Sequence, residues 1–227
     1  MATEMPPQRR DSEVIQILAT EHWSLLATRA LTYQESLGRV NMFLAVLSGA
    51  VIALALIAQA DHFGPTFTSV AIFMLFVVFF VGVATVRRLL MLNRDDYIWV
   101  VGMNRLRHAY LELHPELEPN FITSPHDDLA GALKTLGLDP VSAPSLGTVF
   151  HGLVTLPGML SVVVSAVGAA IAGLAAAGFG APASGILLAG ALAFALSLIG
   201  MLWSARRSFR RYGPAVEPMF PSEGEGK

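Results

Sequence analysis

Apolar residues are gathered into four long runs that contain no acidic or basic side chains. The runs cover residues 42–60, 67–86, 158–179 and 185–203. At a rise of about 1.5 Å per residue, a helix of about 20 residues crosses a hydrocarbon layer of about 30 Å. Each run therefore predicts a transmembrane helix, and short connections between the first two and between the last two group them into two hairpins.

The sequence on either side of the first hairpin is amphipathic. Between residues 11 and 40, leucine, isoleucine and valine recur at three- and four-residue spacings and no proline interrupts them. A similar pattern runs over residues 87–113 and stops before Pro115, a residue that a helix interior does not tolerate. We expect the first two spans to continue as two long antiparallel helices, which we call the stem.

Opposite charges match across the stem when residues at equal distances from the hairpin turn are paired. Three pairs result: Glu21 with Arg105, Arg29 with Asp95 or Asp96, and Glu35 with Arg87 or Arg88. An exposed ion pair contributes only about 0 to 1 kcal/mol, so these pairs are expected to set the helix register more than the stability. The segment EHWSLLATR, residues 21–29, is therefore interpreted as structural.

Basic residues are absent from both short hairpin connections. Of the 15 lysines and arginines, four precede the first run, six lie between the second and third, and five follow the fourth. Basic residues that flank membrane spans are retained on the cytoplasmic side. The distribution predicts that the N-terminus and the C-terminus are both cytoplasmic.

The segment 114–157 is predicted to be a cytoplasmic connection that contains one short helix, residues 124–136. Ser124 suits the N-cap of this helix, because its hydroxyl can accept a hydrogen bond from a free backbone amide. Asp127 and Asp128 suit the positive end of the helix dipole. Helix capping therefore accounts for both carboxylates.

The second hairpin, residues 158–203, is richer in alanine and glycine than the first. Gly168 and Gly173 are each followed four positions later by an alanine, a spacing that allows helices to approach closely. The pattern favours packing between the third and fourth spans of one molecule. It leaves open an interface between copies in a homo-oligomer.

Composition agrees with insertion in a lipid bilayer, since 54% of residues are hydrophobic and 14% are charged. The mean hydropathy is +0.57. Residues 204–227 form a basic juxtamembrane segment and a tail predicted to be disordered, as are residues 1–10. Four arginines are expected to contact anionic lipid headgroups: Arg206, Arg207, Arg210 and Arg211. With a net charge of −2, no nucleic acid partner is expected.

Titratable side chains gather in HPELEPNFITSPHDD, residues 114–128. His114, His126 and Asp127 are of types that bind divalent metals, but prolines and a helix start separate them. The chain has no cysteine, which excludes disulfides and thiolate ligands. We expect no catalytic, cofactor-binding or metal-binding residues and no cofactor; a membrane enzyme that uses these three residues is the remote alternative.

Two short elements, EHWSLLATR at 21–29 and MNRLR at 103–107, resemble elements of a group of uncharacterised bacterial integral-membrane proteins. This resemblance covers about residues 21–117 and implies the same membrane hairpin in a bacterial inner (plasma) membrane, with no known activity. The layout of helix, two spans and second helix is also similar to the SLATT family of predicted pore-forming effectors. The two further spans of this chain depart from that layout.

Together these patterns predict an all-α, polytopic membrane protein with four transmembrane helices and a cytoplasmic antiparallel helical stem. We expect a non-enzymatic function in which the stem binds an unidentified cytoplasmic protein or senses a signal. The alternative is an oligomeric channel or membrane-permeabilising effector that is gated through the stem. The spans contain no charged residue for ion or proton coupling, which counts against a transporter of charged substrates.

Overall fold

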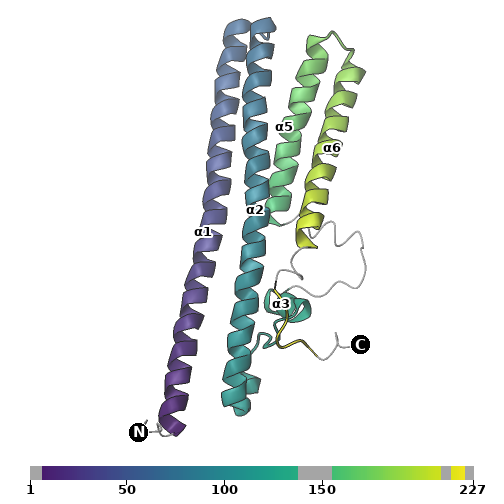
Figure 1. Cartoon of the computed structure of the whole chain (residues 1–227). Coiled ribbons are helices and arrows are strands. Elements are labelled where there is room, and N and C mark those ends of the chain that lie inside the picture. Colours follow the sequence, from purple (N-terminus) through teal and green to yellow (C-terminus); the bar gives the residue numbers. More distant parts are fainter. Residues whose placement is uncertain (1–6, 138–154, 211–215, 223–227) are drawn as a thin grey trace. The chain divides into compact units, whose positions relative to one another are not determined.

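The computed structural model describes residues 7–137, 155–210 and 216–222, and these residues fold into helices and connecting loops (Figure 1). No strand occurs in this part of the chain. The elements, in chain order, are α1 (Pro7–Asp61), α2 (Pro65–Leu113), η1 (Pro115–Asn120), α3 (Leu129–Thr135), α5 (Leu156–Gly178) and α6 (Ala183–Phe209). The predicted all-α class is confirmed.

Four of the helices, α1, α2, α5 and α6, are long and apolar enough to cross a membrane. Each corresponds to one of the four apolar runs, which suggests a multi-pass membrane protein. Helix α1 already includes residues 7–10, which the sequence had placed in a disordered N-terminus, whereas residues 1–6 lie outside the described part. Helix α2 continues beyond its apolar run and ends at Leu113, where Pro115 starts the 3₁₀ helix η1.

The turn between α1 and α2 is held by Asp61. Its carboxylate accepts a hydrogen bond from the Phe67 backbone amide at 2.7 Å, and its carbonyl accepts one from Gly64 at 2.9 Å. His62 and Phe63 both adopt left-handed backbone conformations, with φ of 50° and 62°. A carboxylate at this position satisfies a free amide of the first α2 turn and suits the helix dipole.

The chain divides into two compact units, and each is described by itself. The polar unit comprises Met1–Gln34, Asn93–Ala143 and Phe209–Lys227, and the apolar unit comprises Glu35–Leu92 and Pro144–Ser208. The first holds parts of α1 and α2 together with η1 and α3. The second holds the remainder of α1 and α2, the helix α5 and nearly all of α6.

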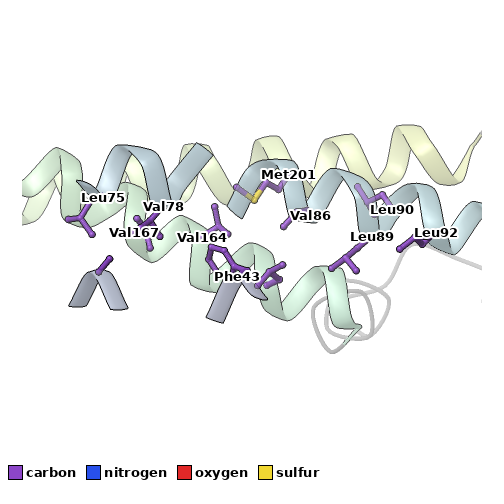
Figure 2. Close-up of a cluster of buried hydrophobic side chains, with 12 residues drawn as sticks. Phe43, Leu75, Val78, Val86, Leu89, Leu90, Leu92, Val164, Val167 and Met201 are labelled. Carbon is purple, nitrogen blue, oxygen red and sulfur yellow. The ribbon is translucent and has the colours of Figure 1, made fainter. Parts of the chain in front are cut away.

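The core of the apolar unit is a cluster of branched aliphatic side chains around Phe43 (Figure 2). Phe43 of α1, Val78 of α2 and Val164 of α5 are fully buried, so three helices meet there. A Cβ built on Gly82 of α2 would lie 2.5 Å from Val164 Cγ2 and 2.9 Å from Phe43 Cε2. Only glycine allows this approach of α2 to its neighbours.

Small residues also let α5 pack between α2 and α6 within the apolar unit. A Cβ on Gly168 would lie 3.0 Å from Phe79 Cε2 and 3.2 Å from the Ser197 hydroxyl. Gly173 has a looser environment, because its Cβ would lie 3.6 Å from Ile186 Cγ2. Both glycines therefore face helices of the same chain. Large apolar side chains cover the outer faces: Leu56, Phe73, Phe80, Leu188 and Leu196 are exposed.

Candidate functional site

The most elaborate polar site of the described residues lies in the polar unit, before helix α3. This helix begins at Leu129 with Asp128 as its N-cap, whose carboxylate accepts a hydrogen bond from the Gly131 amide at 2.7 Å. The predicted start at Ser124 is therefore wrong. Ser124 instead closes a local turn, because its hydroxyl accepts a hydrogen bond from the His126 amide at 3.1 Å.

Asp127 binds a segment from the other end of the chain. Its carboxylate accepts hydrogen bonds from the backbone amides of Met219 at 2.8 Å and Phe220 at 2.7 Å. The Arg105 guanidinium donates to the same carboxylate at 2.7 Å, and the Asp127 side chain is fully enclosed. The Asp127 amide also donates to the Phe220 carbonyl at 3.3 Å. One aspartate thus meets two successive amides and one carbonyl of a peptide segment.

Asp128 continues the same interaction. Its carboxylate accepts hydrogen bonds from the Ser222 backbone amide at 2.8 Å and from the Ser222 hydroxyl. Asp128 is completely buried, and its other carboxylate oxygen holds the Gly131 amide. We call Asp127 and Asp128 the aspartate pair and residues 216–222 the C-terminal segment.

Binding of the C-terminal segment corrects the prediction that the tail is disordered. The composition of PAVEPMFPSEGEGK, rich in proline, glycine and glutamate, is typical of disorder. The segment is ordered because its amides find acceptors more than 90 residues earlier in the chain. Residues 211–215 and 223–227 lie outside the described part.

Asn104 fixes the loop that carries the aspartate pair onto α2. Its side-chain amide donates to the His126 carbonyl at 2.6 Å. Its side-chain oxygen accepts hydrogen bonds from Arg107 at 2.6 Å and from the Thr135 hydroxyl at 2.9 Å. Thr135 in turn accepts from the Ser124 amide at 3.2 Å. This buried network positions both ends of the loop.

Side chains of the C-terminal segment add apolar contacts. The Phe220 ring stacks on the His108 imidazole, with centroids 3.8 Å apart and planes inclined by 20°. Val216 packs against a buried cluster formed by Tyr97, Val100, Val101 and Ala132. The Glu217 carbonyl accepts a hydrogen bond from Arg105 at 2.6 Å. Arg105 therefore joins the segment and the aspartate pair.

The hydrogen bonds keep the aspartate pair ionised despite burial. Burial alone would raise the pKa of Asp127, but the amides of Met219 and Phe220 and the Arg105 guanidinium outweigh it and lower the pKa. Burial opposes ionisation of Asp128 as well, and there the hydroxyl and amide of Ser222 and the Gly131 amide lower the pKa below its usual value. Both carboxylates are thus anionic acceptors near neutral pH.

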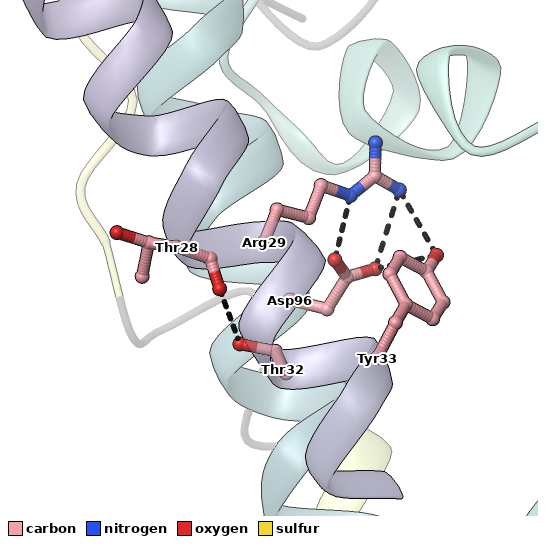
Figure 3. A network of polar contacts seen from close by, with 5 residues as sticks. All are labelled: Thr28, Arg29, Thr32, Tyr33 and Asp96. Atoms are coloured by element: carbon pink, nitrogen blue, oxygen red, sulfur yellow. Dashed lines mark hydrogen bonds and ion pairs between the residues drawn. The ribbon is translucent and has the colours of Figure 1, made fainter. Parts of the chain in front are cut away.

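Two of the three expected stem pairs are present. Within the polar unit, Arg29 Nε lies 2.6 Å from Asp96 Oδ1, and Arg29 Nη2 donates to Asp96 Oδ2 at 3.3 Å (Figure 3). The Tyr33 hydroxyl lies beside both groups. The partner of Arg29 is thus Asp96 rather than Asp95.

The second pair lies within the apolar unit. Arg88 donates two hydrogen bonds to the Glu35 carboxylate, at 3.0 and 3.1 Å, and Arg39 donates a third at 2.7 Å. The partner of Glu35 is thus Arg88 rather than Arg87.

The third expected pair, Glu21 with Arg105, is absent. Both residues line a shallow groove of about 310 Å³ between α1 and α2, which agrees with the register, but Arg105 binds Asp127. The physical reason is the lower dielectric constant around Asp127, which is enclosed, whereas Glu21 is exposed to water. A charge attracts a buried carboxylate more strongly than a solvated one.

The remaining residues singled out from the sequence are the possible metal ligands and the arginines expected to contact lipid. His114 lies 3.0 Å from Glu116, and no group of three or more His, Asp or Glu side chains in the described part is arranged to hold a metal ion. Arg206 and Arg207 occupy the last turn of α6, with the Arg207 guanidinium 5.5 Å from the Trp203 ring centroid. Arg210 directly follows the helix, and Arg211 lies outside the described residues.

Sequence reasoning singled out the MNRLR element and the Asp127–Asp128 doublet separately, but it did not connect them. Asn104 and Arg105 of that element contact the loop and the doublet directly. A helix cap requires one aspartate, and this sequence has two in succession before α3. The additional aspartate was the signal from which the binding site could have been predicted.

Comparisons of the chain with family models, curated proteins and solved structures find no significant match. The two resemblances drawn from its sequence therefore stay predictions.

Proposed function

We propose that this chain is a non-enzymatic, multi-pass protein of a bacterial plasma membrane whose polar unit lies in the cytoplasm and binds a protein partner. The observation that carries the proposal is the aspartate pair, which holds a peptide segment through its backbone amides. Recognition of main-chain groups with adjoining side-chain pockets is a common mode of peptide binding. The polar unit is thus equipped to bind polypeptide.

The distribution of charge supports a cytoplasmic polar unit. Arg105 and Arg107 belong to this unit, whereas the connections at 61–66 and 180–184 contain no lysine or arginine. Basic residues are retained on the cytoplasmic side of membranes. Anionic lipid headgroups would then be the partners of the arginines that follow the last apolar run, at about 1 kcal/mol for each basic residue.

Single-cysteine labelling tests this arrangement, because the chain has no cysteine of its own. Ile122 of the polar unit is 95% exposed and Phe179 of the apolar unit is 92% exposed, so Ile122→Cys and Phe179→Cys are matched reporters. A membrane-impermeant maleimide should label Phe179→Cys in intact cells and Ile122→Cys only after permeabilisation. The cysteine-free parent controls for background. Labelling of Ile122→Cys from outside would contradict the proposal.

Ion flux distinguishes binding from pore formation. Purified protein in dye-loaded proteoliposomes should give the same flux as empty vesicles, with incorporation verified by density flotation. Saturable, protein-dependent flux would favour the alternative of an oligomeric channel or membrane-permeabilising effector. The aspartate pair would then be examined as part of its gate.

A further inference from the structure

We propose that the C-terminal segment is the releasable resident ligand of a peptide-docking site, and that the same site accepts the 216–222 segment of a second copy. The inference rests on the proposed function and names the ligand of that function. It starts from an asymmetry in the contacts. The acceptors are the carboxylates of Asp127 and Asp128 in the loop before α3, whereas the segment supplies mainly backbone donors.

The docking site is largely fixed by contacts that do not involve the segment. Asp128 is held by the Gly131 amide, and the loop is held by Asn104 through the His126 carbonyl. A Cβ on Gly131 would lie 2.2 Å from that carbonyl, so the loop and α3 pack closely. Arg105 reaches Asp127 from α2. These contacts preorganise the carboxylates, which lowers the entropic cost of binding a peptide.

Side chains of the segment give the site its specificity. Phe220 stacks on His108, the Ser222 hydroxyl donates to Asp128, and Val216 reaches the apolar cluster. Met219 has a different role, because its side chain is 64% exposed while its amide is bound. The preferred ligand is therefore a segment with an aromatic residue two positions before a serine.

An identical segment from a second copy supplies every donor that the resident one supplies. Buried carboxylates are costly when they lose their partners, so a vacated site favours occupation by an equivalent ligand. Exchange of identical elements between copies needs no new contacts. The resident segment competes at an effective concentration in the millimolar range, because it belongs to the same chain. Exchange should therefore require either a high local density of the protein or a weakened resident contact.

Pulsed electron–electron double resonance, which measures the distance between two nitroxide labels, tests this proposal on the full-length chain. Lys134→Cys on α3 and Met219→Cys on the segment carry exposed nitroxide labels in a cysteine-free background. In the doubly labelled protein, the expected result is one short, narrow distance. Addition of the peptide VEPMFPS at millimolar concentration should reduce the short-distance population by about half.

Matched peptides control for non-specific effects. VEPAFPS, which changes the exposed methionine, should compete as well as VEPMFPS. VEPMAPA, which lacks the aromatic ring and the hydroxyl, should compete at least tenfold more weakly. Equal competition by all three peptides, or by none of them, would overturn the proposal.

Exchange between copies has its own readout. Equimolar singly labelled proteins, one with Lys134→Cys and one with Met219→Cys, are co-reconstituted in the same vesicles. A short distance between the two labels is expected, and Asp128→Asn on the Lys134→Cys copy should reduce its population. Absence of the short distance at every protein density would overturn exchange. Because both labels lie in the polar unit, these outcomes are independent of the membrane side found by cysteine labelling.

Discussion

The Asp127 carboxylate accepts a hydrogen bond of 2.7 Å from the backbone amide of Phe220, a residue 93 positions later in the chain. The contact joins the connection that follows α2 to the segment that follows α6. It lies in a buried site together with an arginine, a second aspartate and a ring stack. This long-range contact is the basis for assigning a peptide-binding role to the polar unit.

Asp127→Asn should release the C-terminal segment. The amide replaces a charged acceptor, and its NH₂ group cannot accept from the Met219 or Phe220 amide, so at least one donor is left without a partner. Loss of hydrogen bonds to a charged group costs about 1.5 to 3 kcal/mol each, so exchange of these amides should accelerate by about 10- to 100-fold. Hydrogen-exchange mass spectrometry of the peptide covering 216–222 measures this change.

The matched control is Glu217→Gln, because Arg105 binds the carbonyl of Glu217 and not its carboxylate. Exchange of the same peptide should be unchanged in this variant. Unchanged protection in Asp127→Asn would show that the aspartate does not hold the segment.

Acid should release the segment before the helices unfold. Both aspartates have a pKa below the ordinary value of 3.8, so their contribution is complete above that value and is lost as the pH falls through the lower folded-state pKa. The label distance should therefore stay constant from about pH 5 to 8 and broaden below about pH 4. Circular dichroism on the same samples reports whether the helices persist.

The double variant Asp127→Asn/Asp128→Asn should have a broad distance distribution at every pH in this range. A pH-dependent step that survives in this variant would assign the titration to other groups.

The stem register can be tested by exchanging charges at Arg29 and Asp96. Their side chains are mostly buried and make two hydrogen bonds, so Arg29→Asp or Asp96→Arg alone should destabilise the polar unit. The free energy of unfolding of the double variant should be about 1 to 2 kcal/mol higher than the sum of the two single changes predicts. Chemical unfolding in detergent, followed by hydrogen exchange of α1 and α2, provides the free energies.

The same double-mutant cycle with Glu21→Arg and Arg105→Glu should give a coupling free energy within about 0.3 kcal/mol of zero, because Arg105 binds Asp127 instead. Strong coupling at this pair would mean that Arg105 forms its ion pair with Glu21 rather than with Asp127.

Gly82→Ala should destabilise the apolar unit. The added methyl group would overlap Val164 and Phe43, and overpacking of this kind costs about 1 to 3 kcal/mol. Gly49→Ala on α1 is the matched control, since no heavy atom lies within 4 Å of its Cβ position and alanine favours helix. The thermal midpoint of the purified protein should fall for Gly82→Ala and stay level or rise for Gly49→Ala. Equal midpoints would place the close approach of α2 and α5 in doubt.

The helices were predictable because their signals are local. The apolar runs and Pro115 depend only on neighbouring residues, and the pairing of Arg29 with Asp95 or Asp96 follows from the antiparallel geometry of one hairpin. Gly82 was not singled out, because its importance depends on Val164 in a different helix. The sequence pointed to Gly168, whose spacing from a second small residue is visible within α5.

The peptide-binding site was not predictable for a related reason. Its parts lie on α2, the loop before α3 and the chain end, and each part has an ordinary local explanation. Asp128 is indeed a helix cap, yet the same carboxylate also binds Ser222. Polar composition at the chain end suggested disorder because composition contains no information about distant acceptors.

Recognition through the main chain has an evolutionary consequence. The bound amides of Met219 and Phe220 are present in any residue except proline, so many substitutions at Met219 would preserve the contact. Met219 can therefore diverge rapidly among descendants of this gene while Asp127 and Asp128 stay under constraint. In such a lineage, two invariant acidic residues would lie opposite a tail that varies at Met219 and keeps an aromatic residue two positions before a serine.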